Sequence, residues 1–263
     1  MEKLWKYKKI GEVCIVERGA SPRPIDKYIT DNESGINWIK IGDTSDSMYI
    51  TETAQKIIVE GMKKSRYVKP GDFLLSNSMS FGRPYILKID GCIHDGWLVL
   101  RDENALFDKR FLYYYLSSKT TYKKLKSMAV GGVVNNLNSE MVRNVIVPVP
   151  DKEEQSEIAD LFDKIKKILE ENKCYLKEWL KDHPHLSCVI PKYGTVCFLK
   201  YDYKIDSNTF CEKLQEETGV FFVPGCCFDV ENHLRFGLAN DSQIVKEGLE
   251  VFSNWLKKLD TSR

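Results

Sequence analysis

The longest regular alternation of hydrophobic and polar positions covers residues 151–182. Pro148 precedes this segment and Pro184 follows it, so it is bounded by residues that break regular structure. Asp151 is suited to cap a helix, with Glu154 as the second half of a capping box. The apolar positions have the i, i+3, i+4, i+7 spacing of one helical face: Ile158, Leu161, Phe162, Ile165, Ile168 and Leu169. We therefore predict one helix over this range, roughly 48 Å long at a rise of about 1.5 Å per residue.

The long helix separates a front domain, residues 1–150, from a rear domain, residues 183–263. Most apolar segments of the front are short, rich in β-branched or aromatic residues, and separated by Gly, Asp or Pro, which favours strands. They are residues 11–16, 36–41, 73–75, 85–89, 97–100 and 145–149. One helix interrupts them, capped by Asp108 and carrying Phe111, Leu112, Tyr115 and Leu116 on one face. The pattern predicts a mixed, strand-rich front domain.

The rear domain has the pattern of a small α/β unit. Strands are expected at residues 195–201, 220–223 and 234–239, with a helix from Ser207, its cap, to Thr218. A last helix, capped by Asp241 or Ser242, is expected to bury five apolar side chains. They are Ile244, Leu249, Phe252, Trp255 and Leu256. The predicted fold class of the whole chain is α+β: strand-rich front, long connecting helix, small α/β rear.

Composition narrows the class of protein. With 43% hydrophobic and 29% charged residues among 263, the chain is typical of a soluble globular protein with a sizeable core. No apolar run approaches the length of about 18 residues that a membrane span needs, so we expect no membrane partner and a cytoplasmic location. The eight cysteines form no C-x-x-C pair and no zinc-ligand spacing with histidine, so reduced, mostly buried cysteines and no metal are expected.

Charge is distributed unevenly between the two halves. Residues 1–147 carry 23 Lys and Arg against 17 Asp and Glu, whereas residues 148–263 carry 16 against 21. A net charge of +6 in front and −5 behind indicates a polyanionic partner for the front alone. Three loops of the front are dense in hydrogen-bonding side chains: residues 18–24 (RGASPRP), 76–83 (SNSMSFGR) and 131–138 (GGVVNNLN).

These loops carry side chains of the kind that bind DNA. Arginine pairs with guanine, asparagine with adenine, and serine with either. The alternative interpretation is that Ser, Asn and Gly merely fill turns, as they do in most proteins. No catalytic motif is present, since the chain lacks a G-x-G-x-x-G sequence and a P-loop. His94-Asp95 has no Ser or Cys partner at readable spacing and is interpreted as structural or as a DNA contact.

Five separated motifs of the front occur in the order found in one known family. They are residues 10–13 (IGEV), 18–24, 35–43 (GINWIKIGD), 69–76 (KPGDFLLS) and 131–138. Residues 1–168 thereby resemble the target-recognition domain of type I restriction–modification specificity subunits, with the junction to the spacer helix at 147–158. The resemblance implies a subunit that reads double-stranded DNA without chemistry of its own. It also implies binding to methyltransferase subunits and, in the full complex, to a restriction subunit.

The resemblance makes five residues candidates for DNA contacts. They are Arg18, Arg23, Ser78, Arg83 and Asn135. The family has two recognition domains and two antiparallel spacer helices, and this chain has one of each. We therefore expect self-association through the apolar stripe of the helix, unless the rear domain folds back and covers it. Asn172, within the stripe, is expected to be either a buried amide that sets helix register or, as we favour, an exposed residue.

The rear resembles the carboxy-terminal small domain of fold-type I, pyridoxal-phosphate-dependent aminotransferases. The motifs are residues 191–195 (PKYGT), 216–225 (EETGVFFVPG) and 234–236 (LRF). The resemblance places Arg235 where the family binds a substrate carboxylate. It also implies that the large domain, with the cofactor lysine, is missing, because Lys192, Lys200 and Lys204 lie outside the cofactor-lysine context. We expect no cofactor and a vestigial Arg235.

The preferred hypothesis is a half-length, non-catalytic DNA specificity subunit fused near residues 168–172 to an orphan aminotransferase fragment. Two alternatives remain at this point. The chain is a fragment of an aminotransferase, or it is a non-functional fusion product. Sequence alone does not distinguish a genuine gene rearrangement from an assembly or cloning product.

Overall fold

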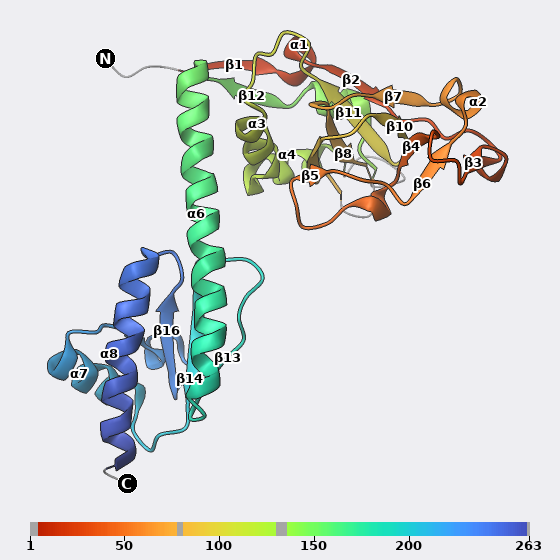
Figure 1. Cartoon of the computed structure of the whole chain (residues 1–263). Helices are drawn as coiled ribbons and strands as arrows, with labels where there is room; N and C mark the ends of the chain where they lie inside the picture. The colour runs from red at the N-terminus through yellow and green to blue at the C-terminus, as the bar shows by residue number, and fades with distance from the viewer. Residues whose placement is uncertain (1–4, 78–80, 130–135, 262–263) are drawn as a thin grey trace. The chain divides into compact units, whose positions relative to one another are not determined.

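The protein consists of two compact units, Met1–Asp160 and Leu161–Arg263. The structure, a computed structural model, describes residues 5–77, 81–129 and 136–261 (Figure 1). Helix α6, Lys152–Trp179, begins in the first unit and continues into the second. Both helices and strands occur in each unit, which confirms the predicted α+β class. Within the described ranges, none of the helices has the length and apolar character to cross a membrane.

The first unit contains two five-stranded sheets and a two-stranded ribbon. The first sheet has the order β3-β6-β4-β10-β7 and the second the order β2-β11-β8-β9-β5. The strands of the first are β3 (Ile29–Thr30), β6 (Gln55–Ile57), β4 (Ile36–Ile39), β10 (Gly91–Ile93) and β7 (Arg66–Val68). Those of the second are β2 (Ile15–Arg18), β11 (Trp97–Arg101), β8 (Phe73–Ser76), β9 (Pro84–Leu87) and β5 (Tyr49–Ile50). The ribbon pairs β1 (Lys6–Lys9) with β12 (Ile146–Val149).

Strand β11 shows how the second sheet is buried on both faces. Because successive side chains of a strand point to opposite faces, its residues divide between two cores. Trp97 and Val99 join the core that also takes in residues of the first sheet. Leu98 and Leu100 join the core under the helices. The sequence therefore reads as an unbroken apolar run, as expected for a strand covered on both sides.

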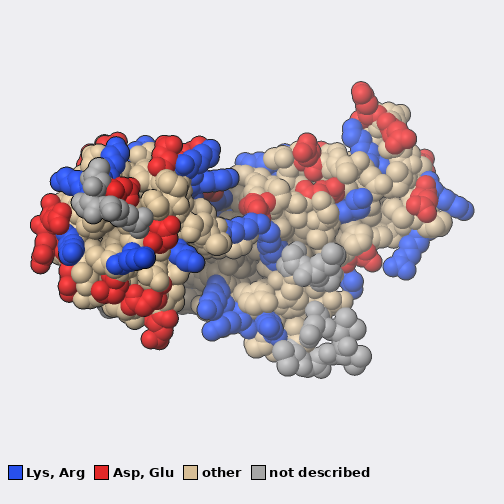
Figure 2. Space-filling view, turned by 90° about the horizontal axis from the view of Figure 1, so that it is seen from below, with Lys and Arg blue, Asp and Glu red and all other residues tan. Residues whose placement is uncertain are grey.

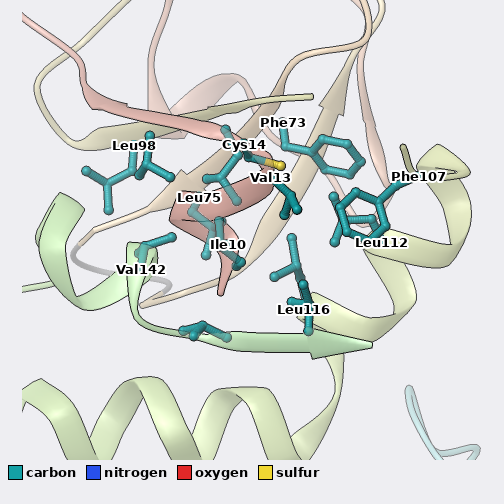
Figure 3. Close-up of a cluster of buried hydrophobic side chains, with 14 of the residues drawn as sticks. Ile10, Val13, Cys14, Phe73, Leu75, Leu98, Phe107, Leu112, Leu116 and Val142 are labelled. Atoms are coloured by element: carbon teal, nitrogen blue, oxygen red, sulfur yellow. The ribbon is translucent and has the colours of Figure 1, made fainter. Parts of the chain in front are cut away.

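Helices cover the second sheet on the side away from the first sheet. They are α1 (Ile10–Val13), α3 (Lys109–Ser117), α4 (Lys119–Ala129) and α5 (Ser139–Arg143). Figure 3 shows Ile10 and Val13 of α1 lying among Leu75 of β8 and Leu112 and Leu116 of α3. A further short helix, α2 (Val59–Met62), follows β6.

Of two predictions about the front, one was right and the other was wrong. Helix α3 is confirmed, since the Asp108 side chain accepts hydrogen bonds from the backbone N–H groups of Arg110 and Phe111. The strand expected at 11–16 is wrong, because α1 occupies 10–13 and the strand begins only at Ile15. Helix α4 was not predicted. It buries Thr121, Leu125 and Ala129 at i, i+4 and i+8, but Thr and Ala are weakly hydrophobic, so the apolar face is faint in the sequence.

Helix α6 begins and ends close to the predicted bounds. Asp151 Oδ1 accepts a hydrogen bond of 2.9 Å from the backbone N–H of Glu154. The Glu154 carboxylate accepts a 2.8 Å bond from the indole Nε1 of Trp5, so it ties the helix to the start of the chain. The α-helix stops at Trp179, and one 3-10 turn, Leu180–Asp182, completes the segment.

The second unit is one four-stranded sheet, of order β13-β14-β16-β15, covered by helices on one face. Its elements are β13 (Leu186–Cys188), β14 (Val196–Tyr201), α7 (Ser207–Thr218), β15 (Val223–Pro224), β16 (His233–Gly237) and α8 (Ser242–Thr261). Cys197, Leu199 and Tyr201 alternate along β14 toward the covered face. Buried side chains from α6, α7 and α8 pack against this face.

Several details of the rear differ from prediction. The cap of α7 is Asp206, which accepts from the Thr209 N–H, and not Ser207. Ile244 is 65% exposed, and the neighbouring Val245 is buried in its place. Strand β15 covers only two residues, beginning at Val223. The first two are one-residue shifts, whereas β15 begins three residues later than expected; sequence patterns define the ends of elements poorly.

Asn172 is buried, so the favoured expectation of an exposed residue is wrong. Its Nδ2 donates to the backbone carbonyl oxygens of Leu238, at 2.9 Å, and Asn240, at 2.8 Å. These carbonyls follow the end of β16, where the sheet no longer supplies partners. A buried backbone carbonyl needs a donor, and the amide of Asn172 supplies it.

The cysteines are only partly as expected. All eight are free thiols. Cys14, Cys92, Cys197 and Cys211 are buried and Cys188 is half-buried. Cys174, Cys226 and Cys227 are exposed, which corrects the expectation that those of the last third lie mostly in the core.

Candidate nucleic-acid interface

Two loops that lie far apart in the sequence contact the turn formed by residues 94–96, and a third loop contacts one of them. The backbone N–H of Asn77 donates to Gly96 O at 2.9 Å, and its Nδ2 donates to Asp95 O at 2.9 Å. From the first loop, Arg18 Nε donates to the same Asp95 carbonyl at 3.1 Å. From the third, the Leu137 N–H donates to Asn77 O at 3.0 Å. The described parts of all three loops are therefore connected by hydrogen bonds, although the contacting residues Asn77 and Leu137 are buried.

The carboxylate of Asp95 is surrounded by polar side chains from this region. Oδ1 accepts a 2.8 Å bond from Ser21 Oγ and lies 3.2 Å from His94 Nε2. Oδ2 lies 3.5 Å from an Nη of Arg23, whose side chain is 83% exposed. We refer to Asp95 and the five side chains around it as the Asp95 cluster. Its members are Arg18, Ser21, Arg23, Asn77, His94 and Asp95.

The Asp95 carboxylate is charged at neutral pH. Burial by itself raises the pKa of Asp95, but the Ser21 hydroxyl, the His94 ring and Arg18 outweigh it and hold the pKa below its ordinary value. The carboxylate is therefore ionised at neutral pH. His94 Nδ1 accepts a 2.8 Å bond from the Gly96 N–H, so the proton of the neutral ring sits on Nε2, facing Asp95. Both ring nitrogens are engaged, which leaves neither to act as a general base in this arrangement.

The Asp95 cluster is open on one side. Asp95, His94 and the buried Trp38 line a cavity of about 400 Å³ between residues 21–26 and strands β4 and β6. The Trp38 and His94 rings meet edge to face, with centroids 6.3 Å apart. The carboxylate is thus held by Ser21 and His94 and also lines the cavity, which is the geometry of a preorganised acceptor.

The other three candidate DNA contacts are Arg83, Ser78 and Asn135. Arg83 lies opposite Ser76, whose N–H donates to its carbonyl oxygen at 3.2 Å. Its guanidinium donates to Ser45 O at 3.1 Å and lies 5.1 Å from the ring centre of Tyr85. Ser78 and Asn135 lie outside the described residues. Ser76 and Asn77 are buried and used within the fold, so the hydroxyl and amide attributed to that part of the loop do not face a ligand.

Helix α4 adds a basic surface that the sequence analysis missed. Its lysines are exposed and the helix contains no acidic residue: they are Lys119, Lys123, Lys124 and Lys126. The helix packs on the hairpin through Tyr122, whose ring centre lies 6.3 Å from that of Phe81, so it adjoins the loops described above. Figure 2 shows acidic and basic side chains mixed over much of one face, with one basic cluster near the centre of the view that has few acidic atoms around it.

Only part of this site is evident from the sequence. The sequence indicates the pair His94-Asp95 as structural or as a DNA contact, but the partners of Asp95 at positions 18, 21 and 23 lie more than 70 residues earlier. For α4, the available signal was the run of four lysines without an acid in 119–126. Across the described ranges, no three His, Cys, Asp or Glu side chains group as metal ligands would.

Arg235 in the second unit lies on the open face of the sheet. The residue is exposed, and its guanidinium carbon is 5.8 Å from the ring centre of Phe228. The three lysines considered from the sequence, Lys192, Lys200 and Lys204, are all exposed. A Schiff-base lysine needs a desolvated pocket that lowers its pKa, so these residues do not fit pyridoxal phosphate.

The sequence of the first unit matches a known family. A family model described as type I restriction modification DNA specificity domain matches residues 2–177. The chain belongs to this family. The resemblance stated for residues 1–168 is thus confirmed.

Specificity subunits are also found among curated proteins and solved structures. The MjaIX specificity subunit of Methanocaldococcus jannaschii is 25% identical over 175 residues, covering 65% of this chain and 40% of that protein. The crystal structure of the HsdS subunit from Thermoanaerobacter tengcongensis has a TM-score of 0.51 at 22% identity, covering 64% of this chain and 38% of that one. The specificity domain described here thus spans about 40% of the length of these relatives.

A second family model, aminotransferase class I and II, matches residues 114–252, so the chain also belongs to that family over its rear part. Cystine lyase CORI3 of Arabidopsis thaliana is 24% identical over 161 residues, covering 59% of this chain and 34% of that enzyme. The two matched ranges overlap, but the structure assigns residues up to Asp160 to the first unit. The expected fusion of two families in one chain is confirmed.

Proposed function

We propose that the first unit reads a short sequence of double-stranded DNA as a half-length specificity subunit of a type I restriction–modification system, without catalysis of its own. The observation that carries this proposal is the hydrogen-bonded connection of the three loops, two of which contact the turn that carries Asp95. Loops fixed on a rigid sheet scaffold are where binding residues concentrate. Arginine side chains that are both exposed and oriented by a neighbour are suited to bind guanine through two parallel hydrogen bonds.

The first unit offers separate surfaces for bases and for phosphates. In the Asp95 cluster, a carboxylate sits among the arginines, and it repels a phosphate that approaches them. Helix α4 carries only lysines, which suit the phosphate backbone, where charge and not shape decides affinity. Base contacts would therefore come from Arg18, Arg23 and Arg83, and backbone contacts from α4. Ser78 and Asn135 remain candidates on the basis of the sequence.

The partners follow from the family and from the exposed stripe of α6. We propose that the subunit binds a methyltransferase subunit and, in the full system, a restriction subunit. Leu161 is 56% and Ile165 36% exposed on α6. Burying such side chains contributes roughly 1.5–3 kcal/mol each, so covering them is favourable. We propose a second copy of this chain as the covering partner, with two α6 helices antiparallel and two recognition units on a symmetric site.

The second unit is proposed to have no aminotransferase activity. The exposure of Lys192, Lys200 and Lys204 supports this proposal, and so does the position of Arg235 on an open sheet face. Arg235 would be able to pair with a carboxylate, but nothing beside it would act on that carboxylate. Adding pyridoxal phosphate to the purified chain should give no visible absorbance band of a lysine Schiff base; a band abolished by Lys192→Ala, Lys200→Ala or Lys204→Ala would overturn this part.

The test of DNA reading is selection from a randomised duplex pool at several salt concentrations. Sequence-specific binding should enrich a short motif, and affinity for that motif should fall linearly on a log–log plot against salt. A pool that stays random after repeated rounds would contradict the proposal. Enrichment without a salt dependence would contradict the role given to the lysines of α4.

A further inference from the structure

We infer that Asp95 is a specificity-determining residue that accepts a hydrogen bond from the N4 amino group of a cytosine, next to a guanine bound by Arg18 or Arg23. This inference rests on the proposed function and adds to it one defined G·C base pair in the recognised site. It assigns a reading role to a carboxylate that otherwise only holds its neighbours in place.

The carboxylate has an acceptor position to spare. An ionised carboxylate offers about four lone-pair positions. Ser21 Oγ and His94 Nε2 both lie on Oδ1, at 2.8 and 3.2 Å. On the other side, Oδ2 has the long 3.5 Å contact with Arg23, whose exposed side chain is free to swing toward a base. Asp95 itself keeps about a third of its side chain exposed, so Oδ2 can receive a donor from a ligand.

The chemistry of the base edges selects cytosine. In the major groove, the edge of cytosine itself offers only a donor, its N4 amino group, and this is the base group that carboxylates accept from. Adenine presents N6 as a donor but N7 as an acceptor next to it, which repels a carboxylate. Guanine presents two acceptors and thymine one, so neither offers Asp95 a hydrogen bond. The guanine paired with the chosen cytosine carries O6 and N7 on the same groove edge, within the class of contacts that arginine makes.

The surroundings keep Asp95 in the form and orientation that this contact needs. The Ser21 Oγ also lies 3.2 Å from the Asp95 N–H, so one hydroxyl fixes both the backbone and the carboxylate of the residue. The His94 ring is held by the Gly96 N–H and by Trp38, so it cannot rotate away without breaking a bond. Little reorganisation is then required when DNA binds, which favours discrimination.

The first test compares selection by the full chain and by Asp95→Asn. Asparagine keeps the shape and the Ser21 bond but adds a donor, and it pairs with adenine through N6 and N7. We expect one G·C position of the selected motif to relax or change to A·T, with the other positions unchanged. Affinity for the original motif should fall by about tenfold, in keeping with the removal of a single hydrogen bond to a base. Asp90→Asn is the control, because it makes the same charge change at an exposed position of the same unit.

A second test needs no altered protein. Replacing each cytosine of the selected motif in turn by 2-pyrimidinone removes only the N4 amino group. One replacement should weaken binding of the unaltered chain about tenfold and have no further effect on Asp95→Asn, as expected when both changes remove the same hydrogen bond. If no single cytosine behaves in this way, or if Asp95→Asn lowers affinity for every sequence equally, Asp95 only positions the arginines. If the unaltered chain selects no motif, the proposed function itself fails.

Discussion

Arg18 Nε and the backbone carbonyl oxygen of Asp95 are joined by a 3.1 Å hydrogen bond, although the residues are 77 positions apart in the chain. The bond uses Nε, and Arg18 remains an exposed residue. An arginine held in this way loses less conformational freedom on binding than one that is free in solution.

Replacing Arg18 by alanine should therefore weaken binding to the selected motif and relax it at one position. Removing a bidentate pair of hydrogen bonds to a base costs about 1–3 kcal/mol, so the dissociation constant should rise by roughly ten- to a hundredfold. Binding measured by fluorescence anisotropy on the selected and a scrambled duplex checks this. Lys8→Ala removes one exposed positive charge from β1 and should change both affinities little. An equal loss of affinity for the two duplexes would reduce Arg18 to a general phosphate contact.

Removing the charges of α4 should act on all sequences alike. The test uses one triple variant, which combines Lys123→Gln, Lys124→Gln and Lys126→Gln. In this variant, the magnitude of the slope of log affinity against log salt should decrease by up to about 0.9 for each phosphate that the lysines no longer neutralise. The enriched motif should stay the same. The matched control is the combination Lys200→Gln, Lys204→Gln, Lys213→Gln in the second unit, with an unchanged slope. A changed motif in the α4 variant would mean that these lysines read bases.

Asn172→Ala should destabilise the second unit. The change leaves the carbonyl oxygen of the buried Leu238 without its donor, which costs about 1–3 kcal/mol; the exposed Asn240 also loses a hydrogen bond. The unfolding midpoint of the second unit in urea should fall, while the first unit is unaffected. Asn208→Ala, an exposed amide on α7 that contacts Glu212, should leave the midpoint nearly unchanged. Equal behaviour of the two variants would show that the Asn172 bonds contribute nothing.

Ile165→Asp should separate the proposed pair of chains. At micromolar concentration the unaltered chain should sediment as a dimer, and a charge placed in the stripe should shift it to a monomer because an unpaired carboxylate is costly to bury. Lys164→Asp changes a neighbouring exposed position and should leave the dimer intact. A monomer for all three proteins would show that a second copy does not cover the stripe.

Local features of the fold were largely predictable from the sequence. The cap residue Asp108 predicted α3, and the cap residue Asp151 together with the spacing of Ile158 and Leu161 predicted α6. These signals are readable in the sequence because a cap and a helical repeat each involve residues only a few positions apart. Helix α4 was not predicted because, of its three buried residues Thr121, Leu125 and Ala129, only Leu125 is strongly hydrophobic. Ile244 and Val245 are adjacent apolar residues, and only packing decides which of them is buried.

The candidate site was less predictable, for a physical reason. Arg18 and Arg23 are candidates from their residue type and the family resemblance, but the group that contacts them, Asp95, is contributed by a turn between β10 and β11. Its position depends on β10 pairing with β4 and β7 and on β11 pairing with β2 and β8. Such long-range pairings are not encoded in any short window of sequence. The burial of Asn172 could not be predicted for the same reason, since its hydrogen-bond partners lie 66 and 68 positions away in the sequence.

The most direct test of DNA reading by the first unit is the ratio of dissociation constants for a scrambled and a selected duplex, measured with the full chain at physiological salt. Sequence-specific proteins bind their sites at least about 10³-fold more tightly than unrelated DNA. We predict a ratio of that order, reduced by Arg18→Ala and unchanged by Lys8→Ala. A ratio near one with the correctly folded, unaltered chain would contradict the account.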